Sequence, residues 1–305
     1  MQIRWKYILG GLFLIASAIW LAIFVFPDKN LHIIACDVGQ GDAILAVYGK
    51  TQILVDGGPN DRVLDCLSRH LPFWDREIEL VILTHPQTDH YTGLIEVFRR
   101  YTINKLIANP IDSSAQAYQV LKNEVGGSGT QVVYPTSGMV IRLGLMHLDI
   151  LHPPHQYFEE IGAGLTPQNN GGVLGVYTTK RDPNDFSIVA ILTLGEFDAL
   201  LTGDIGPQIS NIIAEQLEVS ASRGIEYIKV PHHGSKNGLS KDLLDVVSPK
   251  IAVISAGKNN RYGHPHQEVI ELLSNPPTGG EIKILRTDEL GDVEILTDGK
   301  SWLIE

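Results

Sequence analysis

The sequence has little positive charge and few cysteines, and each shortage excludes a class of function. Its 24 Lys and Arg residues are outnumbered by 35 Asp and Glu residues, which gives a formal net charge of -11. A chain with this balance does not attract nucleic acid through its overall charge, so a polyanionic substrate would need metal ions and a local basic patch. The two cysteines, Cys36 and Cys66, lack the spacing of a zinc knuckle or redox motif. That spacing favours buried free thiols, with a disulfide as the alternative if the domain is exported.

One long apolar run is present, at the N-terminus. Residues 7–26 carry no charge and follow Arg4 and Lys6. About 20 such residues span a bilayer as a helix, and the preceding positive charges predict that residues 1–6 stay in the cytoplasm. A cleaved signal peptide is the alternative, but its apolar stretch is usually shorter and no small-x-small cleavage site follows the run. We expect an uncleaved signal anchor in the cell membrane, with an extracytoplasmic domain over 31–305.

The rest of the chain alternates short β-like and α-like segments separated by Gly, Pro, Asn and Asp, which is the pattern of an α/β domain. Predicted strands lie at 31–36, 43–48, 52–55, 80–83, 104–109, 131–135, 139–143, 146–152, 187–194, 198–201, 226–231, 251–255, 283–286 and 293–297. Predicted helices lie at 61–70, 91–100, 114–125, 207–219, 240–247 and 267–274. Residues 155–184 have no regular pattern, which is typical of a lid or a mobile loop.

The stretch LVILTHPQTDHYTGL, residues 80–94, combines a buried strand with metal-ligand chemistry. The apolar strand ends directly before His85, and Asp89 and His90 follow. Imidazole nitrogens together with a carboxylate oxygen suit Zn²⁺ or Mn²⁺ rather than Ca²⁺, which prefers oxygen ligands. The stretch alone is also compatible with an ordinary polar loop after a strand.

Residues able to bind metal also follow later apolar strands. They are His152, Asp204 and the pair His232 and His233. A single buried histidine is more often a hydrogen-bonded core residue than a ligand. Several histidines and aspartates at strand ends point to one site, because the ends of neighbouring strands converge in space. The repetition therefore predicts a metal site at one edge of a sheet.

The motifs that surround these residues resemble those of the metallo-β-lactamase superfamily, and among its members the hydrolase domain of the ComEC competence proteins. The shared blocks cover nearly all of 31–297 and occur in this order: DVGQGD, VDGG, LTHxxxDHxxG, LHPP, NDFSIV, LLTGD, VPHHGS and NNRYGHP. The resemblance implies an α/β fold, a four-layer αββα sandwich, with two divalent metal ions, Zn²⁺ or Mn²⁺, at one edge. The multi-helix membrane part of ComEC has no counterpart in these 305 residues, so a separate DNA-translocating channel protein is an expected partner.

The resemblance also implies roles for individual residues. His85 and His152 would hold one metal; Asp89, His90 and a histidine of HHGS would hold the second; and Asp204 would bridge both. We place the last ligand at His232, with His233 as the close alternative. Gln87 departs from the superfamily pattern, which has a histidine or, in the ComEC group, commonly an aspartate at this position. Because a glutamine offers a neutral amide oxygen, we expect the His85 site to bind its metal more weakly.

Two close cations activate water and stabilise charge that develops on a phosphoryl or carbonyl oxygen. The residues expected to take part in catalysis are Asp89, Asp204, His233, His264 and Asp37. Asp37, Asp42 and Asp56 either orient the ligand histidines or cap turns, and the sequence leaves both roles open. Candidates for holding substrate phosphate are Ser235, Lys236, Lys258 and Arg261, together with His264; ordinary solvated surface is the alternative for the lysines.

Three functions are compatible with these residues. The resemblance favours a membrane-anchored, outward-facing phosphodiesterase that acts on DNA during uptake. The second is a hydrolase of a small ester, a lactam or a cell-wall phosphodiester, because one fold hosts many chemistries. The third is a non-catalytic binding or assembly module, in which Gln87 marks the loss of a metal ligand.

Overall fold

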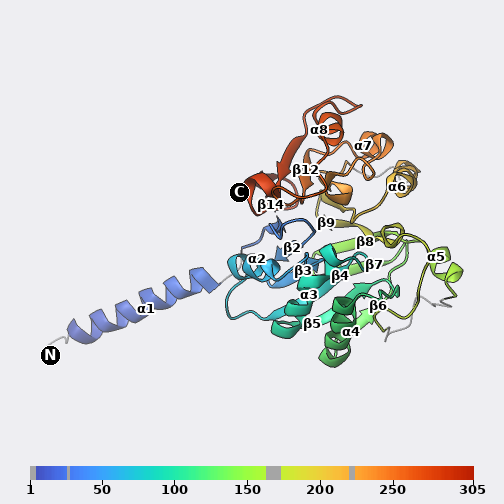
Figure 1. The fold of residues 1–305 in the computed structure, drawn as a ribbon. Helices are drawn as coiled ribbons and strands as arrows, with labels where there is room; N and C mark the ends of the chain where they lie inside the picture. Colours follow the sequence, from blue (N-terminus) through green and yellow to red (C-terminus); the bar gives the residue numbers. More distant parts are fainter. Residues whose placement is uncertain (1–4, 26–27, 163–172, 220–223) are drawn as a thin grey trace.

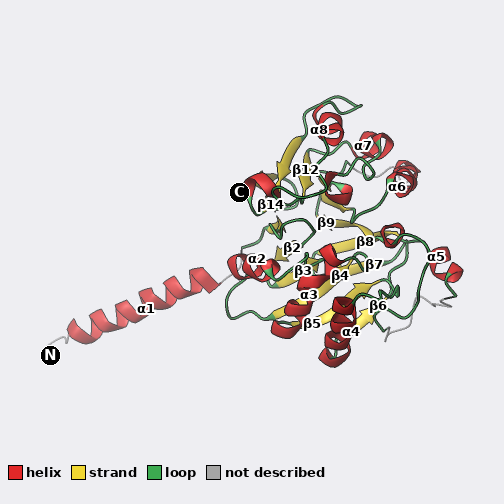
Figure 2. Ribbon diagram, in the orientation of Figure 1, coloured by secondary structure: helices red, strands yellow, loops and turns green. Residues whose placement is uncertain are grey.

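Two β-sheets face each other at the centre of the molecule (Figure 2). The computed structural model describes residues 5–25, 28–162, 173–219 and 224–305, and the elements below lie within these ranges. The first sheet has the order β15 (Trp302–Ile304), β14 (Val293–Thr297), β1 (Leu31–Ala35), β2 (Ile44–Tyr48), β3 (Thr51–Val55), β4 (Glu77–Leu83), β5 (Thr102–Ala108) and β6 (Gln131–Val133). The second has the order β13 (Lys283–Arg286), β12 (Ile251–Ile254), β11 (Tyr227–Lys229), β10 (Phe197–Leu201), β9 (Val189–Leu194), β8 (Met146–His152) and β7 (Val140–Leu143).

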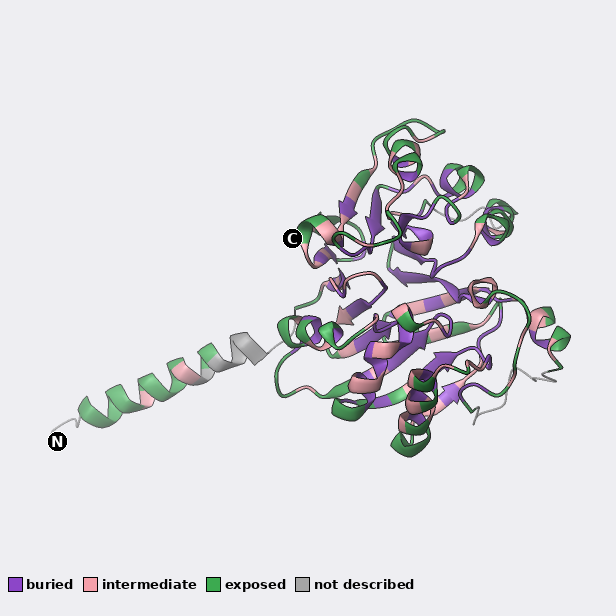
Figure 3. Ribbon diagram, viewed as in Figure 1, coloured by how far each residue is buried: buried purple, intermediate pink, exposed green. Residues whose placement is uncertain are grey.

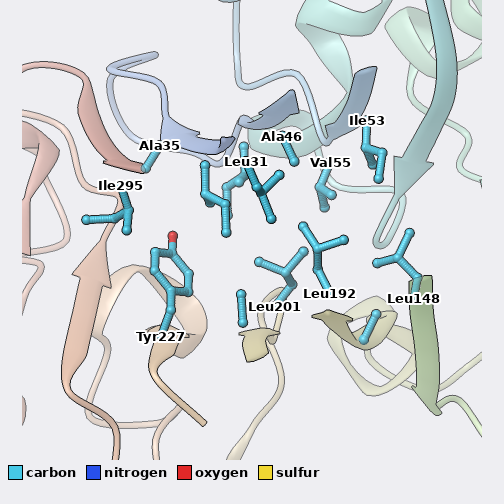
Figure 4. Close-up of a cluster of buried hydrophobic side chains, with 14 of the residues drawn as sticks. Leu31, Ala35, Ala46, Ile53, Val55, Leu148, Leu192, Leu201, Tyr227 and Ile295 are labelled. Atoms are coloured by element: carbon cyan, nitrogen blue, oxygen red, sulfur yellow. The ribbon is translucent and has the colours of Figure 1, made fainter. Parts of the chain in front are cut away.

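The main hydrophobic core fills the space between the two sheets. Figure 4 shows Leu31, Ile53 and Val55 of the first sheet pointing toward Leu192 and Leu201 of the second. These side chains come from alternate positions along their strands, because successive residues of a strand point to opposite faces. The apolar residues between them point outward and pack under helices.

Three helices cover the outer face of each sheet. On the first sheet lie α2 (Arg62–His70), α3 (Thr88–Arg100) and α4 (Gln116–Ser128); on the second lie α6 (Pro207–Val219), α7 (Lys241–Val247) and α8 (Gln267–Ser274). Figure 3 shows that these helices bury one side and expose the other, as amphipathic surface helices do. Shorter elements complete the described chain: α5 (His155–Glu160), α9 (Thr287–Leu290) and the one-turn segments η1 (Pro183–Phe186) and η2 (Pro231–Gly234). The predicted αββα sandwich is therefore confirmed.

The N-terminal helix α1 (Trp5–Val25) projects away from the sandwich (Figure 1). Large side chains along it, such as Trp5, Phe13 and Trp20, are exposed. Across residues 5–25, 28–162, 173–219 and 224–305, no helix has both the length and the apolar character needed to cross a bilayer. The membrane anchor predicted over 7–26 is not confirmed; residue 26 of it, and residues 1–4 of the predicted cytoplasmic N-terminus, lie outside the described residues.

The structure differs from the predicted segments at three places. Helix α3 begins at Thr88 rather than at residue 91, so Asp89 and His90 lie in its first turn and not in a loop. The segment predicted as irregular, 155–184, contains α5 and η1, while its part 163–172 lies outside the described residues. Three short elements, α5, α9 and β15, had no prediction because three to six residues carry little periodic signal.

The two cysteines form a disulfide, so the free thiols favoured from the sequence are wrong. Cys36 follows β1 and Cys66 lies on the buried face of α2, with their Cα atoms 5.8 Å apart. Helix α2 packs on the first sheet, and this packing brings together two residues that are 30 positions apart in the sequence. Spacing along the chain does not report such a contact.

Candidate metal centre

Five of the predicted ligands come together at the edge of the sandwich where β4, β8 and β10 end. His85 follows β4, and Asp89 and His90 begin α3. His152 is the last residue of β8, and Asp204 follows β10. Glycine is required where α3 meets the loop after β3, since a Cβ on Gly93 would lie 2.0 Å from the carbonyl oxygen of Gly57. This close approach holds the first turn of α3 against the end of β3.

The densest cluster consists of Asp89, His90, Asp204 and His233, whose ligand atoms all lie within 4.8 Å of one another. Asp204 Oδ2 is 3.2 Å from His90 Nε2 and 3.1 Å from His233 Nε2. His233 Nε2 is also 3.5 Å from Asp89 Oδ2. Asp89 is the most open member, with a quarter of its side chain exposed, while the other three are almost fully buried.

The cluster contains His233 and not His232, which corrects the choice made from the sequence. His232, His233 and Gly234 follow one another with φ of 52°, 54° and 77° in the segment η2. This left-handed backbone is unfavourable for non-glycine residues and is retained where a site needs it. It turns the His233 ring into the cluster and leaves the His232 ring half-buried beside His264, with ring centroids 6.0 Å apart.

His85 and His152 form a second, sparser pair beside this cluster. The His85 ring lies 4.1 Å from that of His90, centroid to centroid. Burial lowers the pKa of His85 to about 3, helped by the neighbouring His90, and burial lowers the pKa of His152 to about 4. Both rings are therefore neutral at pH 7, which is the form that binds metal. Gln87 is the residue before α3, and its side chain does not cap that helix.

Asp56 orients His90 of the dense cluster directly and His85 of the sparser pair through Thr84. Its Oδ2 accepts a hydrogen bond from His90 Nδ1 at 2.8 Å and one from the Thr84 hydroxyl at 2.7 Å. Because the Thr84 hydroxyl donates its proton to Asp56, the oxygen of this hydroxyl accepts a hydrogen bond from His85 Nδ1 at 3.0 Å. Asp56 itself is fully buried, and its role is the orienting one of the two that the sequence left open.

Ser187 is a second orienting residue, and no role was predicted for it. Its carbonyl oxygen accepts from His152 Nδ1 at 2.9 Å, and its hydroxyl lies 3.3 Å from His85 Nδ1. The same hydroxyl accepts from the backbone N–H of Asp204 at 3.2 Å. The quoted block NDFSIV contained this serine, but a hydroxyl within an apolar strand has no signal of its own in one sequence.

Buried polar atoms that make no hydrogen bond show whether these residues suit a bound metal ion. The Nε2 atoms of His85, His90, His152 and His233 and the Oδ2 atom of Asp204 are buried and accept or donate no hydrogen bond within the described residues. Each of the four histidines uses its Nδ1 for a partner, namely Thr84, Asp56, Ser187 and Ser255 respectively. Buried polar atoms that make no hydrogen bond are costly, and two of these histidine nitrogens, those of His90 and His233, face the same Asp204 oxygen at 3.2 and 3.1 Å. Imidazoles whose Nδ1 is held by a partner and whose Nε2 makes no hydrogen bond suit a divalent metal.

Lys229 adds a buried positive charge to the centre. Its ammonium contacts Asp42 Oδ2 directly, lies 3.4 Å from Asp204 Oδ1 and donates to the carbonyl oxygen of Gly203 at 3.1 Å. Burial disfavours the ammonium, but Asp42 and Asp204 outweigh it and raise the pKa of Lys229. One oxygen of Asp204 thus faces Lys229, and the other faces His90 and His233. The sequence motifs assigned no role to Lys229.

The carboxylates and imidazoles of the cluster hold one another in their charged forms. Burial opposes ionisation of Asp204, yet His233, His90 and Lys229 together keep its pKa well below the ordinary range. Burial likewise opposes protonation of His90 and His233, while Asp204 raises the pKa of both, together with Asp56 for His90 and Asp42 for His233. A cation that replaces these protons meets a preformed set of negative and neutral ligands.

Several other predicted residues lie away from the cluster. The role predicted for Asp37 in catalysis is wrong, because its carboxylate accepts from Arg62 at 2.7 Å and from the Gly39 N–H at 3.2 Å. Ser235 is buried, and its hydroxyl accepts from the Asn237 N–H. Lys236 and Lys258 are exposed at the surface.

Arg261 and His264 lie closer to the centre. The His264 ring centroid is 6.4 Å from that of His233. Arg261 lines a cleft that Gln87 and Asp89 also line. These two residues remain candidates for contact with a substrate.

The family model of the metallo-beta-lactamase superfamily matches residues 36–258. The chain belongs to this superfamily. Its members are generally metal-dependent hydrolases, and the donor set described above agrees with that chemistry.

Among solved structures, the metallo-beta-lactamase fold protein YhfI from Bacillus subtilis is 12% identical with a TM-score of 0.52, covering 88% of this chain and 100% of its own. CmlA from Streptomyces venezuelae, described as a diiron beta-hydroxylase, is 15% identical with a TM-score of 0.53, covering 92% of this chain and 55% of its own. At this identity the two likenesses show the shared fold.

Curated relatives link the chain to competence proteins. ComE operon protein 3 of Bacillus subtilis is 24% identical over 309 residues, which cover 92% of this chain and 35% of the relative. Recombination protein 2 of Haemophilus influenzae is 27% identical over 259 residues, which cover 81% of this chain and 28% of the relative. The chain therefore spans about a third of the length of these relatives. It is a metallo-β-lactamase-fold hydrolase related to competence proteins.

Proposed function

We propose that the chain is a metal-dependent phosphodiesterase that cuts DNA during its uptake. The observation that carries this proposal is the set of five buried ligand atoms that make no hydrogen bond, on His85, His90, His152, His233 and Asp204. The relationship to competence proteins supports DNA as the substrate. The net charge of -11 also agrees with a mechanism in which metals, and not the protein surface, attract the phosphodiester.

Each part of the site has a task in such a reaction. Bound ions supply Lewis-acid stabilisation of the phosphodiester oxygens and activate water. Asp204 and His233 hold the buried side of the centre, while the part-exposed Asp89 marks the side from which substrate enters. Outside the cluster, the imidazoles of His232 and His264 lie 6.3 and 6.4 Å from the His233 ring, centroid to centroid, and are candidates for carrying a proton.

We also propose that the hydrolase domain works outside the cytoplasm, beside a DNA-translocating protein and the membrane. The disulfide between Cys36 and Cys66 supports an oxidising compartment, since disulfides persist there and are rare in the cytosol. The exposed apolar side chains of α1 support contact with lipid or with another apolar helix.

The test is a panel of metals and substrates on the full-length protein. We expect cleavage of DNA with Mn²⁺ or Zn²⁺, and a loss of at least about 100-fold in kcat/KM for Asp204→Ala, because loss of a ligand exceeds the 10–100-fold cost of losing an outer partner. Lys250→Ala serves as the control, since this lysine is exposed on the surface. Turnover of a lactam or ester with DNA left intact, or no hydrolysis with any divalent metal, would contradict the proposal.

A further inference from the structure

A cleft of about 500 Å³ opens directly beside the metal centre. It is lined by Val38, Gly39, Gln40, Pro59, Asn60, Gln87, Thr88, Asp89, Asn260, Arg261 and Tyr262. Its volume lies within the range of pockets that bind small molecules, and Asp89 belongs both to its wall and to the metal cluster. A molecule in the cleft therefore reaches the cluster from the side on which that cluster is open to solvent.

One wall of the cleft is an exposed aromatic ring held in a braced loop. Tyr262 is 50% exposed, and its ring lies nearly parallel to that of His264, at 24° and 5.7 Å between centroids. Asn260 braces the loop, because its Oδ1 accepts from the backbone N–H groups of both Tyr262 and His264 at 3.1 and 3.0 Å. Its Nδ2 donates to the carbonyl oxygens of Gly257 and His264. The ring is therefore presented in a fixed position before any ligand arrives.

Arg261 extends this aromatic wall with a cation. Its guanidinium carbon lies 4.9 Å from the centroid of the Tyr262 ring, and Nη2 donates to the Tyr262 hydroxyl at 2.8 Å. A tyrosine ring with a guanidinium plane beside it is a surface on which nucleobases stack, and it accepts any base because each has a π face.

The opposite wall suits an anion. It is formed by the first turn of the 13-residue helix α3, whose leading backbone N–H groups have no acceptor within the helix. Asp89 is the one carboxylate among the residues that line the cleft, and it faces the metal cluster. The neutral side chain of Gln87 stands at this wall, where an aspartate would repel a phosphodiester.

We propose that this cleft is a nucleotide subsite, in which a base stacks on Tyr262 and Arg261 while its phosphate lies against the first turn of α3 beside Gln87. The proposal rests on the phosphodiesterase function and makes its substrate class narrower. A base that stacks on a protein ring has left its own duplex stack, so the preferred substrate is single-stranded nucleic acid. Gln87 then has a role in admitting the phosphate, in addition to its effect on the metal ligands.

The experiment compares two small substrates that share a leaving group and differ in the base. They are thymidine 5′-(p-nitrophenyl phosphate) and methyl p-nitrophenyl phosphate, assayed on the full-length metal-loaded protein. Removal of one stacking ring costs about 5- to 100-fold per base, so Tyr262→Ala should lower the ratio of kcat/KM for the two substrates by that factor. Tyr262→Phe should restore the ratio, since phenylalanine keeps the ring. Phe73→Ala is the matched control, because Phe73 is an exposed aromatic that precedes β4, at the end of the strand opposite to the metal centre.

A second readout does not depend on turnover. Stacking quenches the fluorescence of 2-aminopurine, so a single-stranded oligodeoxynucleotide that carries this base should lose fluorescence on binding to the wild type and not on binding to Tyr262→Ala. An unchanged substrate ratio in Tyr262→Ala, or equal quenching by the two proteins, would overturn the subsite. If neither ester is hydrolysed by the wild type, the phosphodiesterase function fails, while the quenching still decides whether the ring binds a base.

Discussion

Within the described residues, two groups of histidines and carboxylates differ in where their ring nitrogens lie. In the metal centre, the buried Nε2 atoms of His85 and His152 make no hydrogen bond, and those of His90 and His233 both face one oxygen, Oδ2 of Asp204, at 3.2 and 3.1 Å. In the second cluster, His70 places Nε2 3.1 Å from Asp292 and Nδ1 3.4 Å from Glu294. His32 places Nδ1 2.6 Å from Glu294 and Nε2 3.0 Å from Asp28. We call this second group the His70 cluster.

The difference separates a ligand set from a set of ion pairs. The His70 cluster has no free ring nitrogen, and Asp292 and Glu294 raise the pKa of His70 to about 9, so its ring is a cation at pH 7. Cys66 lies within 4.8 Å of ligand atoms on His70 and Asp292, but its sulfur is bonded to Cys36 and is not available to a metal. Proximity of histidine, cysteine and aspartate is thus insufficient, and buried nitrogens that make no hydrogen bond are the more informative sign.

The largest effect is expected at the buried cation of the metal centre. Lys229→Met leaves the buried carboxylates of Asp42 and Asp204 without their cation, and removal of one partner from a buried ion pair costs about 3–5 kcal/mol. Urea denaturation of the metal-free protein measures the change in the free energy of unfolding. The exposed Lys250→Met should change it by less than about 0.5 kcal/mol. A similar small change in both variants would show that Lys229 does not neutralise the centre.

The next effect distinguishes the two halves of the centre. His85→Ala removes one of the two histidines of the sparser position, so the metal affinity of that position should fall by about 100-fold or more, beyond the cost of losing an outer partner. The cluster of Asp89, His90, Asp204 and His233 should keep its ion, because its four ligands are unchanged. Metal analysis after dialysis at graded metal concentrations separates the two positions. Loss of both ions together would mean that the halves are not independent.

A smaller effect is expected from a residue that touches no metal. Asp56→Asn weakens the hydrogen bonds to His90 Nδ1 and to Thr84, and metal affinity should fall by about 10- to 100-fold. Asp37→Asn is the matched control, because its carboxylate pairs with Arg62 outside the centre and its loss should leave metal affinity unchanged. An equal loss of metal affinity in the two variants would show that Asp37 contributes to the metal centre.

The smallest effect concerns the His70 cluster. His70→Gln removes charge-assisted hydrogen bonds to Asp292 and Glu294 and should lower the free energy of unfolding by about 1–2 kcal/mol at pH 6, without a change in metal binding. Since the pKa of His70 is raised from 6.5 to about 9, this contribution is complete below pH 6.5 and is lost as the pH rises through 9. Denaturation at pH 6 and pH 10 measures it. A difference between wild type and variant that persists at pH 10 would contradict the assignment.

The resemblance of the motifs to a known superfamily predicts the sandwich, and the recurrence of ligands after apolar strands predicts most of the metal centre. His85, His152 and Asp204 lie at or just after strand ends, and Asp89 and His90 begin the helix that follows β4, so their convergence follows from the fold. The choice between His232 and His233 needs the backbone angles of η2, which no spacing reveals. The same holds for Lys229, Ser187 and the partner of Asp37, since these contacts join residues far apart in the sequence.

The most direct test of the account is a metal titration of three full-length proteins: the wild type, His233→Ala and His70→Ala. Each is dialysed against Zn²⁺ or Mn²⁺, and the bound metal is measured as a function of the free concentration. The account predicts a tightly bound ion in the wild type and in His70→Ala, and its loss in His233→Ala, because the free Nε2 of His233 belongs to the centre. A tight ion that survives His233→Ala, or disappears in His70→Ala, would contradict it.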